Sequence, residues 1–314
     1  MNKTGLYLTL ALGLSFLSAC NSNDDVLNDN FNGEITIDGD VECCSVEEAR
    51  LVYNFVKTVR EMPVFSDTID GTYRLHAYTS GGSLHVGYND LWVVVTKLKN
   101  ANYVKEFTLQ SITPLMTMQM ASGMTMQHSA PTGGDAEGVT DQPSALKHTW
   151  VSFLMAAEGD DKWELSYSLS VQGGETHMIT KAVNVAALPE GQSWLKSFKD
   201  ESGDTYFLSL VSPDKWQTGS NDIRAYVSRK STPATDPYPV ADRVFTIDID
   251  PRMPDMGGHT SPDNEALTLQ DDDSYLGKIN LTMTGLWRIY LTVKDEDGNL
   301  VAGGDNTLYW DVTL

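Results

Sequence analysis

Short runs of apolar residues fill most of the chain after about residue 68. Examples are LWVVVTKL, WELSYSLSV, RVFTIDID and WRIYLTVKD, which are rich in Val, Ile, Thr and aromatic residues. Turn-forming stretches such as EGDDK, QGGE and DEDGN separate many of these runs. This pattern is typical of short strands joined by tight turns. It predicts an all-β fold built from β-sandwiches.

One segment has helical spacing instead. In SVEEARLVYNFVKTVREM, residues 45–62, apolar side chains recur every three to four positions, as at Leu51, Val52 and Phe55. Ser45 and Glu48 have the spacing of a capping box. We expect a single helix over 45–62 that leads into the first β-domain.

Three sequence blocks recur in the same order along the chain. GYNDLWVVVTK, which starts at Gly87, matches GSNDIRAYVSRK, which starts at Gly219. VKEFTLQSITPLM matches DRVFTIDIDPRM, and HTWVSFLMAAEGDDKWELSYSL matches LGKINLTMTGLWRIYLTV. Conserved order predicts two copies of one sandwich, over 68–186 and 204–314, joined by the link ALPEGQSWLKSFKDESGD.

The N-terminus has the composition of an export signal. Lys3 precedes an apolar stretch that is too short to span a membrane. The stretch ends in Leu-Ser-Ala-Cys, which resembles the lipobox of bacterial lipoproteins. The resemblance implies that residues 1–19 are removed and that Cys20 carries a lipid anchor in the membrane. The alternative is an ordinary secretory signal in which Cys20 is incidental.

Residues 20–44 are polar and acidic, and their composition predicts a flexible tether. Acidic residues after the lipidated Cys resemble the surface-export signals of Bacteroidetes-type lipoproteins. We therefore expect an outer-membrane lipoprotein of the bacterial cell envelope, facing the periplasm or the cell surface. Cys43 and Cys44 are adjacent, so an ordinary structural disulfide is disfavoured. A strained vicinal disulfide, an interchain pair, a soft-metal site and no role at all remain open for them.

Charge and motifs narrow the function classes. The 314 residues include 22 Lys and Arg against 43 Asp and Glu, a net charge of −21. This balance argues against nucleic-acid partners and against electrostatic docking on anionic lipid, since both need clustered cations. The sequence contains no Gly-x-Ser-x-Gly, His-Glu-x-x-His or phosphate-binding loop. We therefore expect no enzymatic activity.

Methionine is concentrated in MTMQMASGMTMQH, which holds five of the 12 Met and one of the six His. Strand alternation puts every second residue on one face, and ASG is a fair hairpin turn. The candidate ligands are Met116, Met118, Met120, Met124, Met126 and His128. Thioethers and imidazole together suit Cu(I). Flexible core packing, which Met often provides, and a partner-binding surface are the alternatives.

A second group of candidates lies in the other repeat. Met253, Met256 and His259 are three residues apart in the Pro- and Gly-rich stretch MPDMGGH, and Met283 follows on a later strand. A curled loop would let these side chains converge on a soft metal. The alternative is a loop that simply caps the sandwich. The repeat aligns Met155 with Met283 and Trp163 with Trp287.

MPDMGGH followed by GKINLTMTGLWRIYLTV resembles the YtkA-like domain family. These are small immunoglobulin-like sandwiches of bacterial envelope proteins, often associated with copper handling and related to FixH-like assembly factors. The resemblance implies a copper-type ligand class rather than a reaction. The family's marked positions correspond to Met253, Met256, His259, Met283, Gly285 and Trp287. The first copy lacks Met-Pro-x-Met and has a longer spacing between its Met and Trp.

Together these features predict an envelope lipoprotein that binds copper, as Cu(I), for tolerance, buffering or delivery. Its expected partner is an envelope protein that donates or accepts copper. Two alternatives carry no metal. One is a cell-surface module of adhesion or glycan-utilisation machinery, and the other is a scaffold without a ligand.

Overall fold

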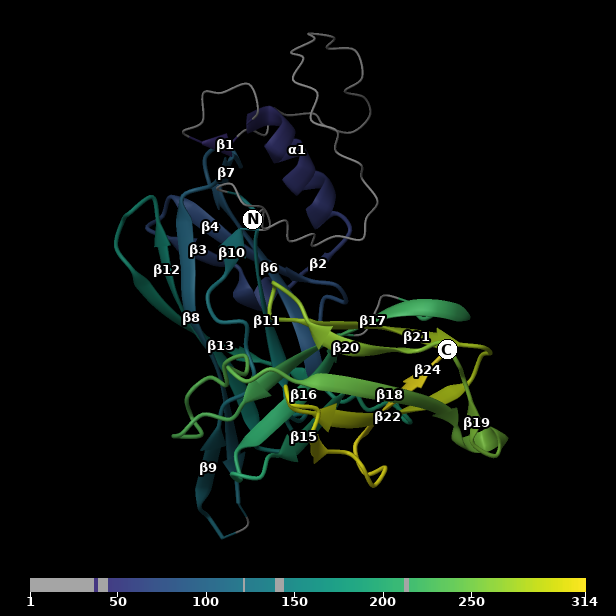
Figure 1. Ribbon diagram of the computed structural model, residues 1–314. Coiled ribbons are helices and arrows are strands. Elements are labelled where there is room, and N and C mark those ends of the chain that lie inside the picture. The colour runs from purple at the N-terminus through teal and green to yellow at the C-terminus, as the bar shows by residue number, and fades with distance from the viewer. Residues whose placement is uncertain (1–36, 39–44, 121, 139–143, 212–214) are drawn as a thin grey trace, which may run out of the picture.

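The regular secondary structure of the described residues is almost entirely strand, which confirms the all-β prediction (Figure 1). The computed structural model describes residues 37–38, 45–120, 122–138, 144–211 and 215–314. The predicted signal peptide, Cys20, Cys43, Cys44 and nearly all of the tether lie outside these residues. Within the described part of the chain, no helix is long and apolar enough to cross a membrane.

The first sandwich comprises residues 60–186. Its main strands are β4 (Tyr73–Thr79), β6 (Gly87–Lys97), β8 (Phe107–Gln119), β9 (Thr125–His128), β11 (Lys147–Phe153), β12 (Lys162–Val171) and β13 (His177–Val183). Shorter elements are β2 (Arg60–Glu61), η2 (Pro63–Phe65), β3 (Asp67–Ile69), β5 (Leu84–His85), β7 (Tyr103–Val104), β10 (Glu137–Gly138) and β14 (Val185–Ala186). Strands β4, β6 and β11 are neighbours in one sheet, and the order β13-β12-β8-β9 forms the other.

The second sandwich comprises residues 195–314. Its strands are β15 (Leu195–Lys199), β16 (Thr205–Val211), β17 (Gly219–Arg229), β18 (Thr246–Met253), β19 (His259–Thr260), β20 (Glu265–Leu269), β21 (Tyr275–Leu281), β22 (Leu286–Lys294), β23 (Leu300–Ala302) and β24 (Tyr309–Thr313), with η3 (Pro254–Met256) after β18. Strands β16, β17 and β21 run side by side, as β4, β6 and β11 do. Strand β22 lies between β18 and β24, and β20 pairs with both β18 and β21, so all ten strands belong to one continuous sheet.

Matching side-chain bonds mark the start of β6 and β17. The Asn89 amide donates to the carbonyl of Gly87 at 2.8 Å, and its oxygen accepts from the His85 N–H at 2.9 Å. The Asn221 amide donates to Gly219 at 2.9 Å, and its oxygen accepts from the Gln217 N–H at 2.9 Å. These bonds occur where the GYND and GSND blocks recur in the sequence.

The N-terminal helix is shorter than expected. Helix α1 spans Ser45–Val56, and a short β1 (Ile37–Asp38) precedes it. The last residues of the predicted helix turn away, because Arg60–Glu61 pairs with β4 instead. The Glu48 carboxylate accepts from the Ala145 N–H at 2.9 Å and pairs with Lys105 at 2.6 Å. These contacts fasten α1 to the first sandwich.

The predicted link between the sandwiches is partly strand. Residues 195–199, inside the expected link, form β15 and pair with β16. Phe198 alternates with charged neighbours and is buried in the second core. Met62 and Phe65 similarly place the start of the first core before residue 68. Alternation over only five residues carries little signal in a sequence, so β15 was not predicted inside the link.

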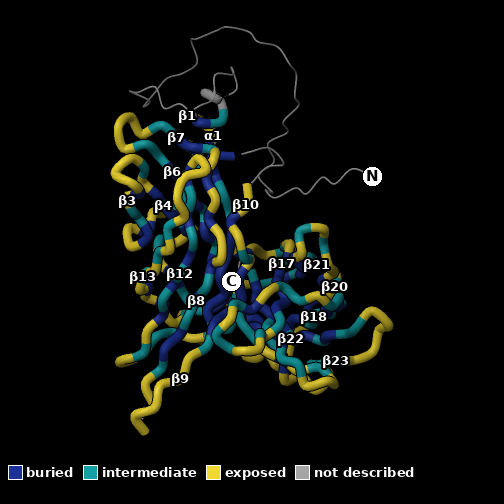
Figure 2. Tube along the Cα trace, turned by 90° about the vertical axis from the view of Figure 1, so that its left-hand side faces the viewer, coloured by how far each residue is buried: buried dark blue, intermediate teal, exposed yellow. Residues whose placement is uncertain are grey.

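The two sandwiches contact each other directly. Tyr88 and Tyr226 stack with their ring centroids 5.6 Å apart, and Trp150 stacks on Tyr226 at 4.5 Å. The hydroxyls of Ser152 and Ser209 form a buried hydrogen bond of 2.7 Å. Figure 2 shows that buried chain runs through both sandwiches, whereas the β9 end of the first one is exposed.

Candidate soft-metal site at the Met-rich hairpin

The predicted hairpin forms at MTMQMASGMTMQH. Strands β8 and β9 are antiparallel, with Met116 opposite His128 and Met118 opposite Met126. The Met120 N–H donates to the carbonyl of Met124 at 2.9 Å, which closes the turn. Directly opposed residues share a face of a sheet. The β8–β9 segment 116–128, called the Met-rich hairpin from here on, therefore puts its thioethers and its imidazole on one face.

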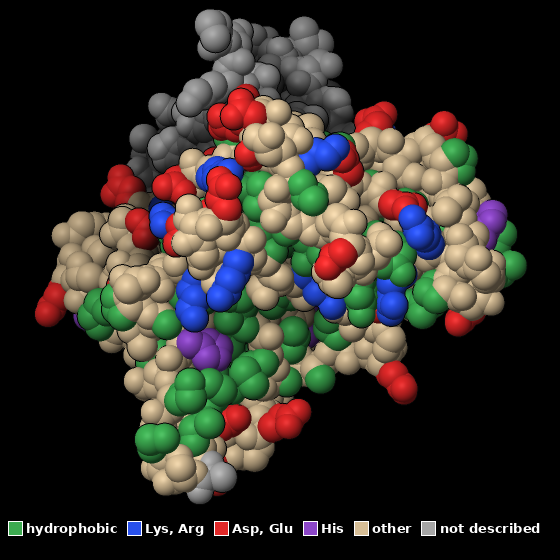
Figure 3. All heavy atoms as spheres, turned by 60° about the horizontal axis from the view of Figure 1, so that its bottom comes forward, with side chains coloured by type: hydrophobic (Ala, Val, Ile, Leu, Met, Phe, Trp, Pro, Cys, Tyr) green, Lys and Arg blue, Asp and Glu red, His purple; other side chains and the backbone are tan. Residues whose placement is uncertain are grey.

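Burial falls steeply along this face. Met116 is fully buried and Met118 packs against the first core, so core packing accounts for both. Towards the tip, the exposed fraction is 50% for Met126, 41% for Met120 and 64% for Met124. Figure 3 shows hydrophobic side chains gathered at the end of the molecule where Figure 1 places β9. Packing in this chain does not explain these three thioethers.

The His128 ring is fixed on two sides. Its Nδ1 lies 2.8 Å from the carbonyl oxygen of Ser129, and an N–H must be the donor in that bond. This tautomer leaves the lone pair on Nε2, the arrangement commonly found when imidazole binds a metal. The ring also lies edge-on to Trp163, with the centroids 5.4 Å apart. His128 is thereby oriented with Nε2 free to accept a ligand.

His128 belongs to a row of three side chains across the sheet. Met116 on β8 pairs with His128 on one side and with Trp163 of β12 on the other. Trp163 is fully buried, and its indole N–H donates to the carbonyl of Met155 at 2.9 Å. The row thus places an aromatic anchor beneath the imidazole and ties a further methionine to that anchor.

The second sandwich repeats these contacts. Met253 on β18 pairs with His259 on β19. Strands β18 and β22 pair Arg252 with Arg288. The next residue along each strand in the same direction is Met253 on β18 and Trp287 on β22.

The ring centroids of His259 and Trp287 are 6.2 Å apart. The Trp287 indole N–H donates to the carbonyl of Met283 at 2.9 Å. Met253, His259 and Met283 are therefore grouped around one buried tryptophan.

The second group is less open than the first. Met253 ends strand β18 and is buried, rather than opening a loop as expected, and Met283 packs on the core. His259 Nε2 lies 3.3 Å from the Thr282 hydroxyl. Met256, in η3, is exposed to solvent. Core packing accounts for Met253 better than metal binding does, which leaves three candidates in this group.

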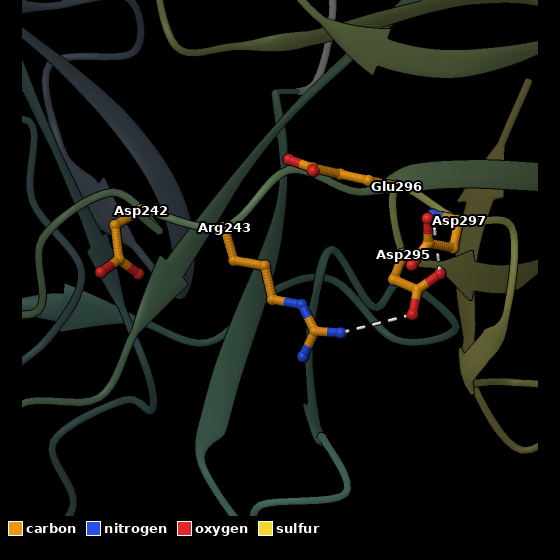
Figure 4. A pocket seen from close by; sticks show the side chains of 5 residues that line it. All are labelled: Asp242, Arg243, Asp295, Glu296 and Asp297. Atoms are coloured by element: carbon orange, nitrogen blue, oxygen red, sulfur yellow. Dashed lines mark hydrogen bonds and ion pairs between the residues drawn. The ribbon is translucent and has the colours of Figure 1, made fainter.

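An acidic hollow in the second sandwich was not singled out from the sequence, where 43 acidic residues obscure any pattern. Figure 4 shows its lining by Asp242, Arg243, Asp295, Glu296 and Asp297. Arg243 pairs with Asp295 at 3.5 Å. The side-chain amide and backbone N–H of Asn299 also donate to Asp295 and lower the pKa of its carboxyl. The hollow is open and acidic, since four carboxylates and one arginine line it.

No group of three or more His, Cys, Asp or Glu residues within the described ranges could hold a metal ion. A site for hard or borderline ions, which need such ligands, therefore has no support in that part of the chain. The Met-rich hairpin offers the opposite donor set of several neutral sulfur atoms and one nitrogen. A soft ion such as Cu(I) fits that set.

Comparison with known proteins adds one family. Residues 200–292 match the model of the YtkA-like family, which confirms the resemblance expected for the second sandwich. No curated protein matches the chain. One solved structure, titled BspA_C_WT, aligns with 82% of this chain and 99% of its own, at 10% identity and a TM-score of 0.14. That likeness is too low to carry an argument about fold or function.

Proposed function

We propose that this protein binds Cu(I) at the Met-rich hairpin and buffers or delivers it within a bacterial cell envelope. The observation that carries the proposal is the face of exposed thioethers that ends in an oriented imidazole. The YtkA-like match at residues 200–292 supports the same ligand class. Lipid attachment at Cys20, an outer-membrane location, a copper-exchanging envelope partner and the lack of enzymatic activity are parts of this proposal.

The donor set distinguishes binding from packing. Leu or Ile would fill a core as well as Met and would be stiffer. The three outer methionines of the hairpin are 41–64% exposed, so they contribute little to any core. A thioether is neutral and soft, and it favours Cu(I) over Zn²⁺, Ca²⁺ or Mg²⁺. A site made of such ligands exchanges its ion readily, and this suits delivery better than storage.

The rival function, a glycan-binding surface module, needs exposed aromatic side chains. Of the seven tryptophans, five are buried: Trp150, Trp163, Trp216, Trp287 and Trp310. The remaining two are half-buried and engaged with other rings, Trp92 with Phe55 and Trp194 with His85. This distribution weighs against an aromatic platform for sugars and favours the copper proposal.

The test is a Cu(I) titration against a competing chelator, without oxygen. The protein is residues 21–314 with Cys43→Ser and Cys44→Ser, because free thiols would bind Cu(I) themselves. In the hairpin variant, Met118, Met120, Met124 and Met126 are changed to Leu, while buried Met116 is kept. The matched control is Met178→Leu, since Met178 is 72% exposed on β13, away from the hairpin.

We expect tight Cu(I) binding by the parent and by the Met178→Leu control. The hairpin variant should bind at least about tenfold more weakly, since even outer-shell changes cost 10–100-fold in metal affinity. Thermal unfolding should show that all three proteins are folded. A parent that takes up no Cu(I) would overturn the proposal. Undiminished binding by the hairpin variant would move the site to His259 and Met283.

A further inference from the structure

We infer that Met155 is an additional ligand of the copper site at the Met-rich hairpin. The inference rests on the proposed function, because it names a residue of the same site. Met155 lies between β11 and β12, far from the hairpin in sequence. Its assignment comes from the position of Trp163, which contacts both the hairpin and Met155.

Trp163 links the main chain of Met155 to the His128 imidazole. One edge of the indole donates its N–H to the Met155 carbonyl at 2.9 Å, and the ring lies 5.4 Å from the His128 ring, centroid to centroid. Trp163 is itself immobile, since it is fully buried and packs edge-on against Phe153 at 5.0 Å. One buried side chain therefore contacts both Met155 and His128. A long, flexible methionine side chain can span such a gap.

The second sandwich shows the same pairing in another sequence context. There the Trp287 indole N–H bonds the carbonyl of Met283 at the same 2.9 Å, and His259 lies next to the same indole ring. The loops differ in length, with MAAEGDDKW in the first sandwich and MTGLW in the second. A buried indole needs some acceptor, but any residue supplies a carbonyl. The bond from the indole N–H to a backbone carbonyl therefore does not explain why Met occupies both positions, 155 and 283.

Packing does not require the Met155 side chain. Its exposed fraction is 37%, and it is absent from the hydrophobic cluster that includes its neighbours Leu154 and Ala157. An exposed thioether on a residue that shares Trp163 with the oriented imidazole would add one more soft ligand on a second chain segment. Two segments that supply ligands also make the geometry of a site more precise than a hairpin tip does alone.

The experiment follows the methyl groups of methionine by NMR. The protein of the titration above is labelled with ¹³C at the methionine methyls, and Cu(I), or Ag(I) as an air-stable analogue, is added stepwise. Met155→Leu and Met178→Leu variants assign the two signals that matter. We expect the Met155 methyl signal to shift together with those of Met118, Met126 and the other hairpin methionines. The signal of Met178 should stay in place.

Each outcome has a distinct meaning. If the hairpin signals shift and that of Met155 does not, the inference is wrong and the proposed function stands. If no methionine signal shifts, the proposed function itself fails. In the chelator titration, Met155→Leu should weaken Cu(I) binding by about tenfold or more, and Met178→Leu should not change it. Unchanged affinity in Met155→Leu would also overturn the inference.

Discussion

The two sandwiches differ most where their His–Met–Trp rows meet solvent. In the first, β8 has 13 residues and runs past Met116 into the Met-rich hairpin. In the second, β18 has eight residues and stops at Met253, where η3 begins. Figure 1 shows β9 at the end of a projecting hairpin, whereas η3 and β19 form a compact turn. The His–Met–Trp rows are therefore alike in the two sandwiches, whereas the chain segments that continue beyond Met116 and Met253 differ.

This difference separates the residues that shape both cores from the residues that could bind a metal. A methionine, a histidine and a tryptophan in register recur in both sandwiches, and each tryptophan is fully buried. The exposed thioethers on the hairpin face occur in the first sandwich only, within the residues described. The row therefore organises the end of each core, and the hairpin adds the donors that a soft ion needs. The predictions below test that division, beginning with the row itself.

Removing the tryptophan of either row should have the largest effect. Trp163→Ala and Trp287→Ala each leave a cavity in a dry core and should cost about 3–5 kcal/mol of unfolding free energy. Chemical denaturation of each variant measures the loss. A conservative Trp→Phe change should cost clearly less at both positions. If one tryptophan is dispensable and the other is not, the rows are not equivalent parts of the two cores.

Much of this architecture was predictable because it follows from local patterns. Alternation in FTLQSITPLMTMQ and MTMQH fixes which side chains share a face, and ASG allows the turn, so the hairpin was predicted correctly. The equivalence of Met155 with Met283 and of Trp163 with Trp287 followed from the repeated blocks. The sequence did not predict how deeply each side chain is buried. Met253 was assigned to a Pro- and Gly-rich loop, yet it is the buried last residue of β18.

Long-range contacts are what the sequence could not predict. The capping box of Ser45 and Glu48 stays a prediction, whereas the structure shows that the Glu48 carboxylate binds Lys105 and the Ala145 N–H, which lie far away in sequence. A capping box can be recognised within four residues, whereas a tertiary ion pair cannot. The hydrogen bond between His128 Nδ1 and the Ser129 carbonyl joins adjacent residues. Even so, the dipeptide His-Ser at the end of a strand does not predict this bond. Orientation of the candidate imidazole had to come from the structure.

Substitution of Gly285, which lies between Met283 and Trp287, should give the next largest loss of unfolding free energy. Gly285 has a φ of +131°, and a Cβ there would lie 2.8 Å from the terminal carbon of Met253. Gly285→Ala combines backbone strain with overpacking and should cost about 1–3 kcal/mol. Gly159→Ala is the matched control in the first sandwich, since its φ is +60° and nothing lies within 4 Å of the added methyl. It should cost less in denaturation, and equal losses would mean that Met253 simply moves aside.

The two histidines sharpen the comparison at the level of binding. His128 keeps Nε2 free, whereas His259 Nε2 lies near the Thr282 hydroxyl. His128→Ala should therefore weaken Cu(I) binding by about tenfold or more, the scale of effect seen when a metal site is disturbed. His259→Ala should weaken it less. Chelator competition on both variants measures the difference, and a larger effect at His259 would place the main site in the second sandwich.

The smallest effects should come from two exposed methionines with similar surroundings. Met124 on the hairpin is 64% exposed and Met256 in η3 is 55% exposed, so neither Leu substitution should change the unfolding free energy by more than about 0.5 kcal/mol. Burial therefore cannot account for any difference between them in Cu(I) binding. We expect Met124→Leu to weaken binding less than His128→Ala does, because neighbouring thioethers replace the lost one. Met256→Leu should leave binding at limiting Cu(I) unchanged. The reverse order would show that the ion prefers the YtkA-like turn, and that the hairpin thioethers serve a surface contact instead.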